Sequence, residues 1–211
     1  MSLEDLRLRV ADGIDDAGMI FFTEDQIDHS IDEAMEVIAE KSGCIKRSAF
    51  VSVREGANFY FINSIATDIM IPYRIWNENR GSRLKGTTMA ELDSYHRTWL
   101  TTSGDPDSWF PVSWDYFGVY PHAATAGGVL RVDYLAWPRA LQDDDDEPEL
   151  PESSQDALIH YAINEGHLKQ WDTNSALLAW AMFQKATGES KARTNVERIR
   201  AGGFTRGGLK T

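Results

Sequence analysis

The sequence predicts an α+β protein: N- and C-terminal helices form a bundle, a small antiparallel β subdomain is inserted between them, and a flexible C-terminal tail follows. Apolar residues recur at helical spacing near both ends of the chain and alternate along its middle, and the last eleven residues contain four glycines. These observations divide the chain into a helical bundle from residues 1–43 and 152–200, a β-rich subdomain over 44–151 with a short helix and an acidic linker, and a tail over 201–211.

Two helices are expected before the β-rich segment. The first is short and spans residues 3–10. The second begins at Thr23, where Gln26 three residues later completes a capping box, and it ends at Gly43. Its buried face is predicted by apolar residues at helical spacing, namely Ile27, Ile31, Ala34, Met35 and Ile38. Its opposite face carries Asp28, Asp32, Glu36 and Glu40. Such an acidic face is either a solvated surface or one that repels a polyanion.

Strands are expected in the middle of the chain. Residues 47–53 alternate between two faces, and residues 59–62 and 69–76 are rich in aromatic and β-branched side chains. Pro72 places the last of these strands toward a sheet edge, because proline lacks the N–H that a central strand donates. Thr88 begins a short helix with a second capping box.

A hairpin is expected next, with arms at residues 117–120 and 129–135 and its turn at residues 125–128. Leu130, Val132 and Tyr134 share one face of the second arm. The acidic linker that follows contains Asp143, Asp144, Asp145 and Asp146, and its charge predicts a solvated segment.

Helices resume near residue 152. Residues 176–183 are apolar nearly all round the helix, which predicts a buried helix. A charged helix over residues 189–200 then leads into the glycine-rich tail.

The charge of the chain excludes one class of function. A net charge of −12 argues against a protein that wraps nucleic acid, because phosphate contacts need clustered lysine and arginine. Residues 1–43 hold twelve acidic and three basic side chains, whereas residues 185–211 hold seven basic and two acidic ones. A basic end on an acidic body is typical of a segment that docks on another surface. No apolar run has the length of a membrane span and the acidic start does not resemble a signal peptide, so no membrane partner is expected.

Catalytic and metal-binding patterns are weak. His160 and His167 lie two helical turns apart, about 10 Å along the axis, which is too far for both to bind one zinc ion. The sequence lacks the HExxH, GxSxG, Walker A and Rossmann patterns, and Cys44 is its single cysteine. We therefore expect no catalytic residue, no cofactor and no metal site.

Tryptophan is abundant in the middle of the chain, at Trp76, Trp99, Trp109, Trp114 and Trp137. Large rings fill small cores and subunit interfaces, which is one interpretation. A platform on which sugars stack is the other.

A series of short motifs runs between residues 69 and 161. In chain order they are Ile71 to Asn77, Leu84, Met89 to Asp93, Trp99, Gly104-Asp105-Pro106, Val119-Tyr120-Pro121, Leu130 to Tyr134, Trp137-Pro138 and Leu150-Pro151. This order resembles the adaptor proteins of tailed phages, also called head–tail connector or head-completion proteins and, in short-tailed phages, tail tubular proteins. The acidic run at residues 143–147 is longer than the family pattern, and the N-terminal helices match it loosely.

The resemblance implies a structural protein of the virion neck and not an enzyme. It implies a homo-oligomeric ring, dodecameric in the family, that assembles in the host cytoplasm and sits under the portal protein. The ring extends the DNA channel toward a tail or nozzle protein, and double-stranded DNA passes through it without specific binding. The C-terminal segment is expected to dock on the portal. Its basic, glycine-spaced composition with apolar anchors agrees with this, and the docking residues are Arg200, Phe204, Arg206, Leu209 and Lys210.

The acidic segments gain a function from this resemblance. A channel in which DNA slides should not bind phosphates, so the acidic face of residues 28–40, or the acidic run, is expected to point to the channel or to solvent. Three alternatives stay open. They are another neck or tail-completion (stopper) protein, a tryptophan-based carbohydrate-binding module, and a metal-dependent hydrolase that uses His160 or His167.

Overall fold

The chain divides into two units, with boundaries after residues 45 and 136. The structure is a computed structural model that describes the backbone of residues 1–200 and the side chains of residues 1–188. Mainly antiparallel sheets, with one short α-helix at Met89–Tyr95, occupy the middle of the sequence, and longer helices lie on either side, so the α+β class is confirmed. Residues 137–151, which the sequence pattern groups with the β-rich segment, belong to the helical unit.

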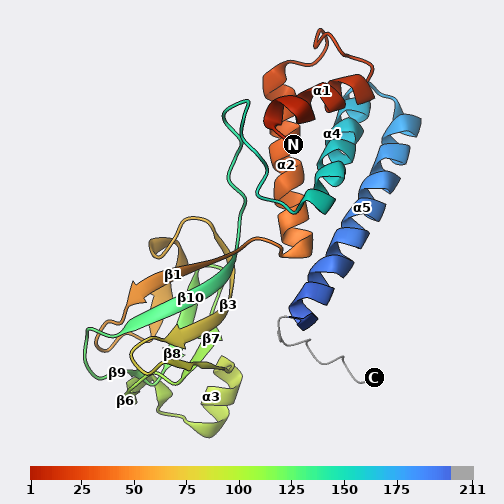
Figure 1. Cartoon of the computed structure of the whole chain (residues 1–211). Helices are drawn as coiled ribbons and strands as arrows, with labels where there is room; N and C mark the ends of the chain where they lie inside the picture. Colours follow the sequence, from red (N-terminus) through yellow and green to blue (C-terminus); the bar gives the residue numbers. More distant parts are fainter. Residues whose placement is uncertain (201–211) are drawn as a thin grey trace, which may run out of the picture. The chain divides into compact units, whose positions relative to one another are not determined.

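The helical unit is built from helices contributed by both ends of the chain (Figure 1). The N-terminal part supplies α1 (Leu3–Gly13) and α2 (Glu24–Ser42). The C-terminal part supplies the short 3-10 helix η3 (Glu152–Ser154), α4 (Gln155–Lys169) and α5 (Thr173–Arg200). The helices expected near residues 3–10 and 23–43 are confirmed.

Local sequence signals fix the ends of α2 and its buried face. The Thr23 N–H donates to Gln26 Oε1 at 3.2 Å, as the capping box predicts, and Gly43 ends the helix with a φ of 56°. Side chains from each helix then meet in one core, whose members include Leu6, Val10, Ile31, Met35, Ile38, Leu158 and Phe183. Gly13 and Gly166 permit close approach of α1 and α4, because a Cβ at Gly13 would lie 2.3 Å from Ile163 Cδ1 and one at Gly166 would lie 2.6 Å from Ile14 Cγ2.

The expectation of a buried helix over residues 176–183 is wrong. Leu177 and Leu178 are each 66% exposed, and Met182 is 46% exposed. Helix α5 packs on α4 and α2 with one face only, which contains Ala176, Ala179 and Phe183. Although this helix is apolar nearly all round, only one of its faces is buried and the other is exposed. The charged segment at residues 189–200 continues the same helix.

The β unit contains a four-stranded antiparallel sheet, in the order β1 (Lys46–Ser52), β10 (Val129–Ala136), β3 (Ile69–Asn77) and β4 (Ser82–Arg83). Leu130, Val132 and Tyr134 of β10 are at most 3% exposed, which confirms the face predicted for them. Strand β3 pairs with β4 only at Trp76 and Asn77. Pro72 therefore lies where β3 has a partner on one side alone, as a proline in a strand requires.

A second four-stranded sheet contains β2 (Phe59–Phe61), β8 (Tyr116–Tyr120), β7 (Ser108–Pro111) and β5 (Lys85–Gly86) in that order. The remaining elements of the unit are η1 (Ile62–Ser64), α3 (Met89–Tyr95), η2 (Trp99–Thr101) and the parallel pair β6 (Ser103–Gly104) and β9 (His122–Ala123). The hairpin expected between residues 117–120 and 129–135 is wrong, because β8 and β10 belong to different sheets. Both edges of β10 are already paired, with β1 and β3.

Candidate functional site

The acidic residues of α2 and of the loop before α4 meet at Arg7 of α1. The Arg7 guanidinium donates to both carboxylate oxygens of Asp28, at 2.5 and 2.8 Å, and its third nitrogen donates to Asp144. The Arg7 side chain is only 12% exposed, and the hydrogen bond to Asp28 raises its pKa. One arginine therefore joins α1, α2 and the acidic loop.

The acidic loop is ordered by its own backbone. The N–H groups of Leu3 and Glu4, which open α1 and have no partner within the helix, donate to the carbonyl oxygens of Asp146 and Asp144 at 2.9 and 3.2 Å. The Asp146 carboxylate accepts the N–H groups of Asp143 and Gln142 at 3.0 and 2.8 Å, and these hydrogen bonds lower its pKa. The segment expected to be a solvated linker is therefore a structured loop that caps α1.

The predicted acidic face of α2 is divided. Glu36 and Glu40 are exposed, whereas Asp28 and Asp32 are half-buried against their own chain. The Asp32 carboxylate accepts the Leu141 N–H at 3.2 Å, and burial raises its pKa despite this hydrogen bond. In the loop, Asp143, Asp144 and Asp145 are exposed and Asp146 is half-buried.

The residues predicted to dock on the portal lie at and beyond the end of α5. Phe204, Arg206, Leu209 and Lys210 fall outside the described residues. The backbone of Arg200 is the last helical position of α5, and its side chain also lies outside the described part.

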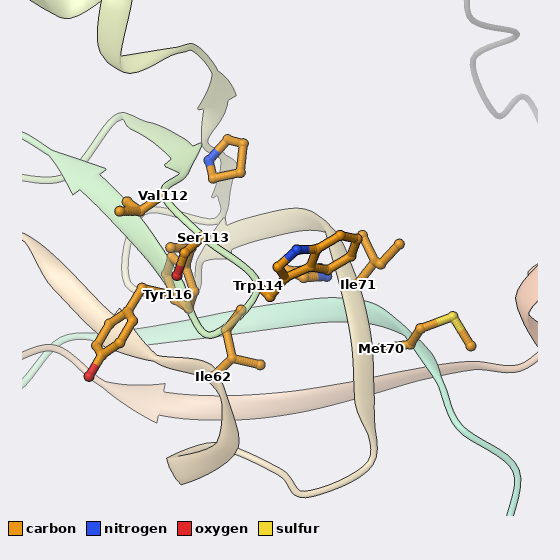
Figure 2. Close-up of a pocket in the computed structure, with 10 residues that line it drawn as sticks. Ile62, Met70, Ile71, Val112, Ser113, Trp114 and Tyr116 are labelled. Atoms are coloured by element: carbon orange, nitrogen blue, oxygen red, sulfur yellow. The ribbon is translucent and has the colours of Figure 1, made fainter.

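The β unit carries an apolar groove that sequence patterns did not reveal. The groove has a volume of about 400 Å³, and its lining side chains come from η1, β3 and the β7–β8 turn, as Figure 2 shows. Trp114 in that turn is 83% exposed, and Ile71 and Tyr116 are each 43% exposed. Exposed apolar side chains grouped in this way make the groove a candidate interaction surface. The single signal in the sequence was the unusual run Pro111 to Tyr116, which places Trp114 in a turn.

The other tryptophans of the β unit do not form a sugar-stacking platform. Trp99 is 3% exposed and packs edge-on against Phe110, with the ring centroids 5.3 Å apart. Trp76 lies between the guanidinium carbons of Arg74 and Arg131, which are 5.7 and 5.3 Å from its ring centroid. Within residues 46–136, Trp114 is the tryptophan whose face is open to a ligand, so coplanar exposed rings are not present there.

The unit boundaries show where the charge of the chain resides. Residues 46–136 contain nine acidic and nine basic side chains, so the β unit has no net charge. The whole net charge of −12 therefore belongs to the sequence of the helical unit. The helical unit therefore repels polyanions and the helical units of other copies, whereas the β unit has no net charge.

Among the residues that the structure describes, no three His, Cys, Asp or Glu side chains are grouped to hold a metal ion. No helix in the described part of the chain combines the length and apolar content needed to cross a bilayer.

A family model described as SU10 adaptor protein matches residues 1–206, which cover both units. The match extends well beyond the segment on which the resemblance to phage adaptors was noted. No curated protein shows a significant match to the sequence.

Proposed function

The chain belongs to the SU10 adaptor protein family, a family of phage adaptors, and we propose that it is a structural subunit of the head–tail connector. In this proposal, a homo-oligomeric ring, dodecameric as the resemblance implies, sits under the portal protein and extends the DNA channel toward a tail or nozzle protein. The subunit acts by binding and not by catalysis. The observation that carries the proposal is the family match over residues 1–206.

The distribution of charge supports a DNA-conducting role. We place the exposed carboxylates of Glu36, Glu40, Asp143 and Asp145 on surfaces that face the channel or solvent. Phosphates near such a surface are repelled, whereas lysine or arginine there would bind the duplex through counterion release. DNA would therefore slide past these residues.

The C-terminal residues supply the contact to the portal. Arg200, Phe204, Arg206, Leu209 and Lys210 combine positive charge with two apolar anchors, and glycines separate them. A segment of this composition can order on a partner surface, with the apolar side chains as anchors.

Electron microscopy of the chain mixed with the portal protein of the same phage tests the proposal. The full-length chain should form a closed ring on the portal, and a chain truncated after Arg200 should not. Replacing Phe204 and Leu209 by serine should also abolish ring formation, whereas Thr205→Ser with Thr211→Ser is the matched control and should not affect it. Binding by neither the full-length nor the truncated chain would reject the portal contact and favour a tail-side (stopper) role.

Assembly without a portal should depend on salt. Because each subunit carries a net charge of −12, copies repel one another at low ionic strength, where the Debye length is about 30 Å at 0.01 M. Sedimentation should therefore show monomers in dilute low-salt buffer. Stable rings under those conditions would contradict this prediction.

A further inference from the structure

The loop between α1 and α2 is held in shape by one carboxylate. Asp16 accepts the N–H groups of Ile20, Phe21 and Phe22 at 3.0, 2.9 and 2.9 Å. These hydrogen bonds, led by that from Phe22, lower the pKa of Asp16, so the carboxylate stays ionised and keeps its three donors. Three consecutive N–H groups on one anion fix the backbone of residues 20–22.

The fixed loop presents two large apolar side chains to solvent. Phe22 turns inward and is 4% exposed, whereas Ile20 is 92% and Phe21 is 66% exposed. The Phe21 ring rests edge-on against Phe22, with the centroids 4.9 Å apart. We call Ile20 and Phe21 the knob. A pair of exposed apolar side chains on a pre-ordered loop loses little conformational entropy when a partner covers it.

The groove of the β unit has the composition and size to receive the knob. Its lining is mainly apolar, with polar groups from Ser113, Tyr116 and Trp114, and its exposed rim is formed by Trp114, Ile71 and Tyr116. Its volume of about 400 Å³ accommodates two side chains of the size of isoleucine and phenylalanine. Knob and groove belong to different units, so each copy carries two unlike surfaces.

Charge decides which surfaces of two copies can meet. Contact between two helical units brings together two bodies that each carry the full net charge of −12, whereas the β unit has none. A contact between the helical unit of one copy and the β unit of the next avoids this repulsion. The repulsion therefore disfavours contact between two helical units, and a contact between unlike surfaces, such as knob and groove, is of the type that generates rings.

We propose that Ile20 and Phe21 of one copy insert into the apolar groove of the next copy. This inference rests on the proposed ring, for which it supplies the contact between neighbouring subunits. The knob is the anchor of a larger interface, because stable interfaces bury about 800 Å² on each partner and concentrate their binding energy in a few central side chains.

Single charges around the two surfaces give the contact a direction. Asp15, Glu24 and Asp25 are exposed on either side of the knob. Lys46 of β1 lies in the same row as Ile71, with Leu135 between them, and it forms no ion pair within the described residues. Lys46→Glu should therefore weaken assembly. Asp115 adjoins the groove between Trp114 and Tyr116 and would repel the acidic residues that flank the knob. Asp115→Asn should therefore strengthen assembly.

Cysteine cross-linking on the portal tests the contact directly. On a Cys44→Ser background, chains with Phe21→Cys are mixed with chains with Trp114→Cys, so that the expected disulfide can form only between copies. Oxidation of the portal-bound ring should give a covalent dimer, in which mass spectrometry identifies a disulfide between positions 21 and 114. Leu8→Cys mixed with Trp114→Cys is the matched control, since Leu8 is also exposed at 54%, and it should give no such link.

Loss of the knob gives a second readout. Ile20→Ser with Phe21→Ser should lower the affinity between copies by about a hundredfold, which corresponds to about 2.7 kcal/mol, while Leu8→Ser leaves it unchanged. Rings that form on the portal without the disulfide between positions 21 and 114, or with the knob removed, would overturn this inference and leave the adaptor function intact. Failure of the unmodified chain to form any ring would overturn the proposed function and this inference with it.

Discussion

The two units satisfy their carboxylates in different ways. In the helical unit, where acids greatly outnumber bases among residues 1–45, Asp16 and Asp146 accept backbone N–H groups of their own loops. In the β unit, where the charges balance, Asp68 and Asp133 accept guanidinium groups of Arg47 and Arg74. In the helical unit, backbone amides thus supplement the guanidinium of Arg7, which binds Asp28 and Asp144. The comparison teaches that a chain can stay strongly acidic and ordered when its loops supply the hydrogen bonds.

The units also differ in their apolar surface. The β unit leaves an apolar groove open, and the helical unit leaves the knob and one face of α5 open. In our proposals, the acidic surface of the helical unit repels DNA, while the neutral β unit receives a neighbour. Four substitutions test whether the two units are stabilised by separate interactions, from the largest expected effect on stability to the smallest.

Phe110→Ala should destabilise the core of the β unit and leave the core of the helical unit folded. Phe110 is fully buried among Phe59 and Trp99, and the lack of a side chain at Gly118 makes room for its ring. Its removal should destabilise the β unit by about 3–5 kcal/mol, while helical circular dichroism persists. Urea unfolding is followed at 222 nm for the helices and by tryptophan fluorescence for the β unit, in a chain whose helical-unit residues Trp137, Trp171 and Trp180 are replaced by phenylalanine. Trp114→Ala is the control, with an effect within about 0.5 kcal/mol. Loss of both signals in one transition would show that the units do not fold independently.

Arg7→Ala should affect the helical unit alone. It leaves Asp28 half-buried without a cation and releases the acidic loop, so the free energy of unfolding should fall by about 2 kcal/mol. Arg9→Ala removes the same charge from an exposed position on α1 and should change stability by less than about 0.5 kcal/mol. Chemical unfolding of both variants makes the comparison. Equal losses of unfolding free energy would mean that positive charge alone, and not the hydrogen bonds of Arg7 to Asp28 and Asp144, stabilises the helical unit.

Asp68→Asn should destabilise the β unit in a pH-dependent way. Burial of Asp68 is outweighed by hydrogen bonds from Arg47 and Tyr134, so its pKa is lowered. A lowered folded-state pKa means that the carboxylate stabilises the fold above its unfolded pKa of about 3.9 and that this is lost as pH falls. The variant should therefore lose about 1 kcal/mol at pH 7, and this penalty should shrink progressively as pH falls below the unfolded pKa. A penalty that keeps the same size as pH falls would rule out the ion pair as its cause.

The smallest effect should have the opposite sign. Burial raises the pKa of Asp32, so its ionised form costs stability once pH rises above the unfolded value. Asp32→Asn keeps an oxygen for the Leu141 N–H and should stabilise the helical unit by roughly 0.5 kcal/mol at pH 7, with no gain at pH 3. Glu36→Gln, on the exposed part of the same helix, is the control. A loss of stability at pH 7 would show that Asp32 is needed as an anion.

The acidic segments could be identified from the sequence, but not their contacts. The acidic residues were identified, yet nothing in their spacing showed that Asp28 and Asp144, which are 116 positions apart, share Arg7. The groove was missed because its lining comes from three separated segments, and nothing in the sequence showed that they meet. In the sequence, Ile20 and Phe21 resemble any apolar loop residues. Only the structure shows that Asp16 fixes their backbone.

The sequence by itself determined the features that depend on neighbours within about four residues, namely both capping boxes, the buried face of α2 and the face of β10, and from these the α+β class. Only the tertiary structure decided the pairing of β10 with β1 and β3, the order of the acidic loop and the face of α5 that is buried. The physical reason is range. Capping and periodicity act within one turn or one strand, whereas strand pairing and burial depend on which distant segments compete for the same surface.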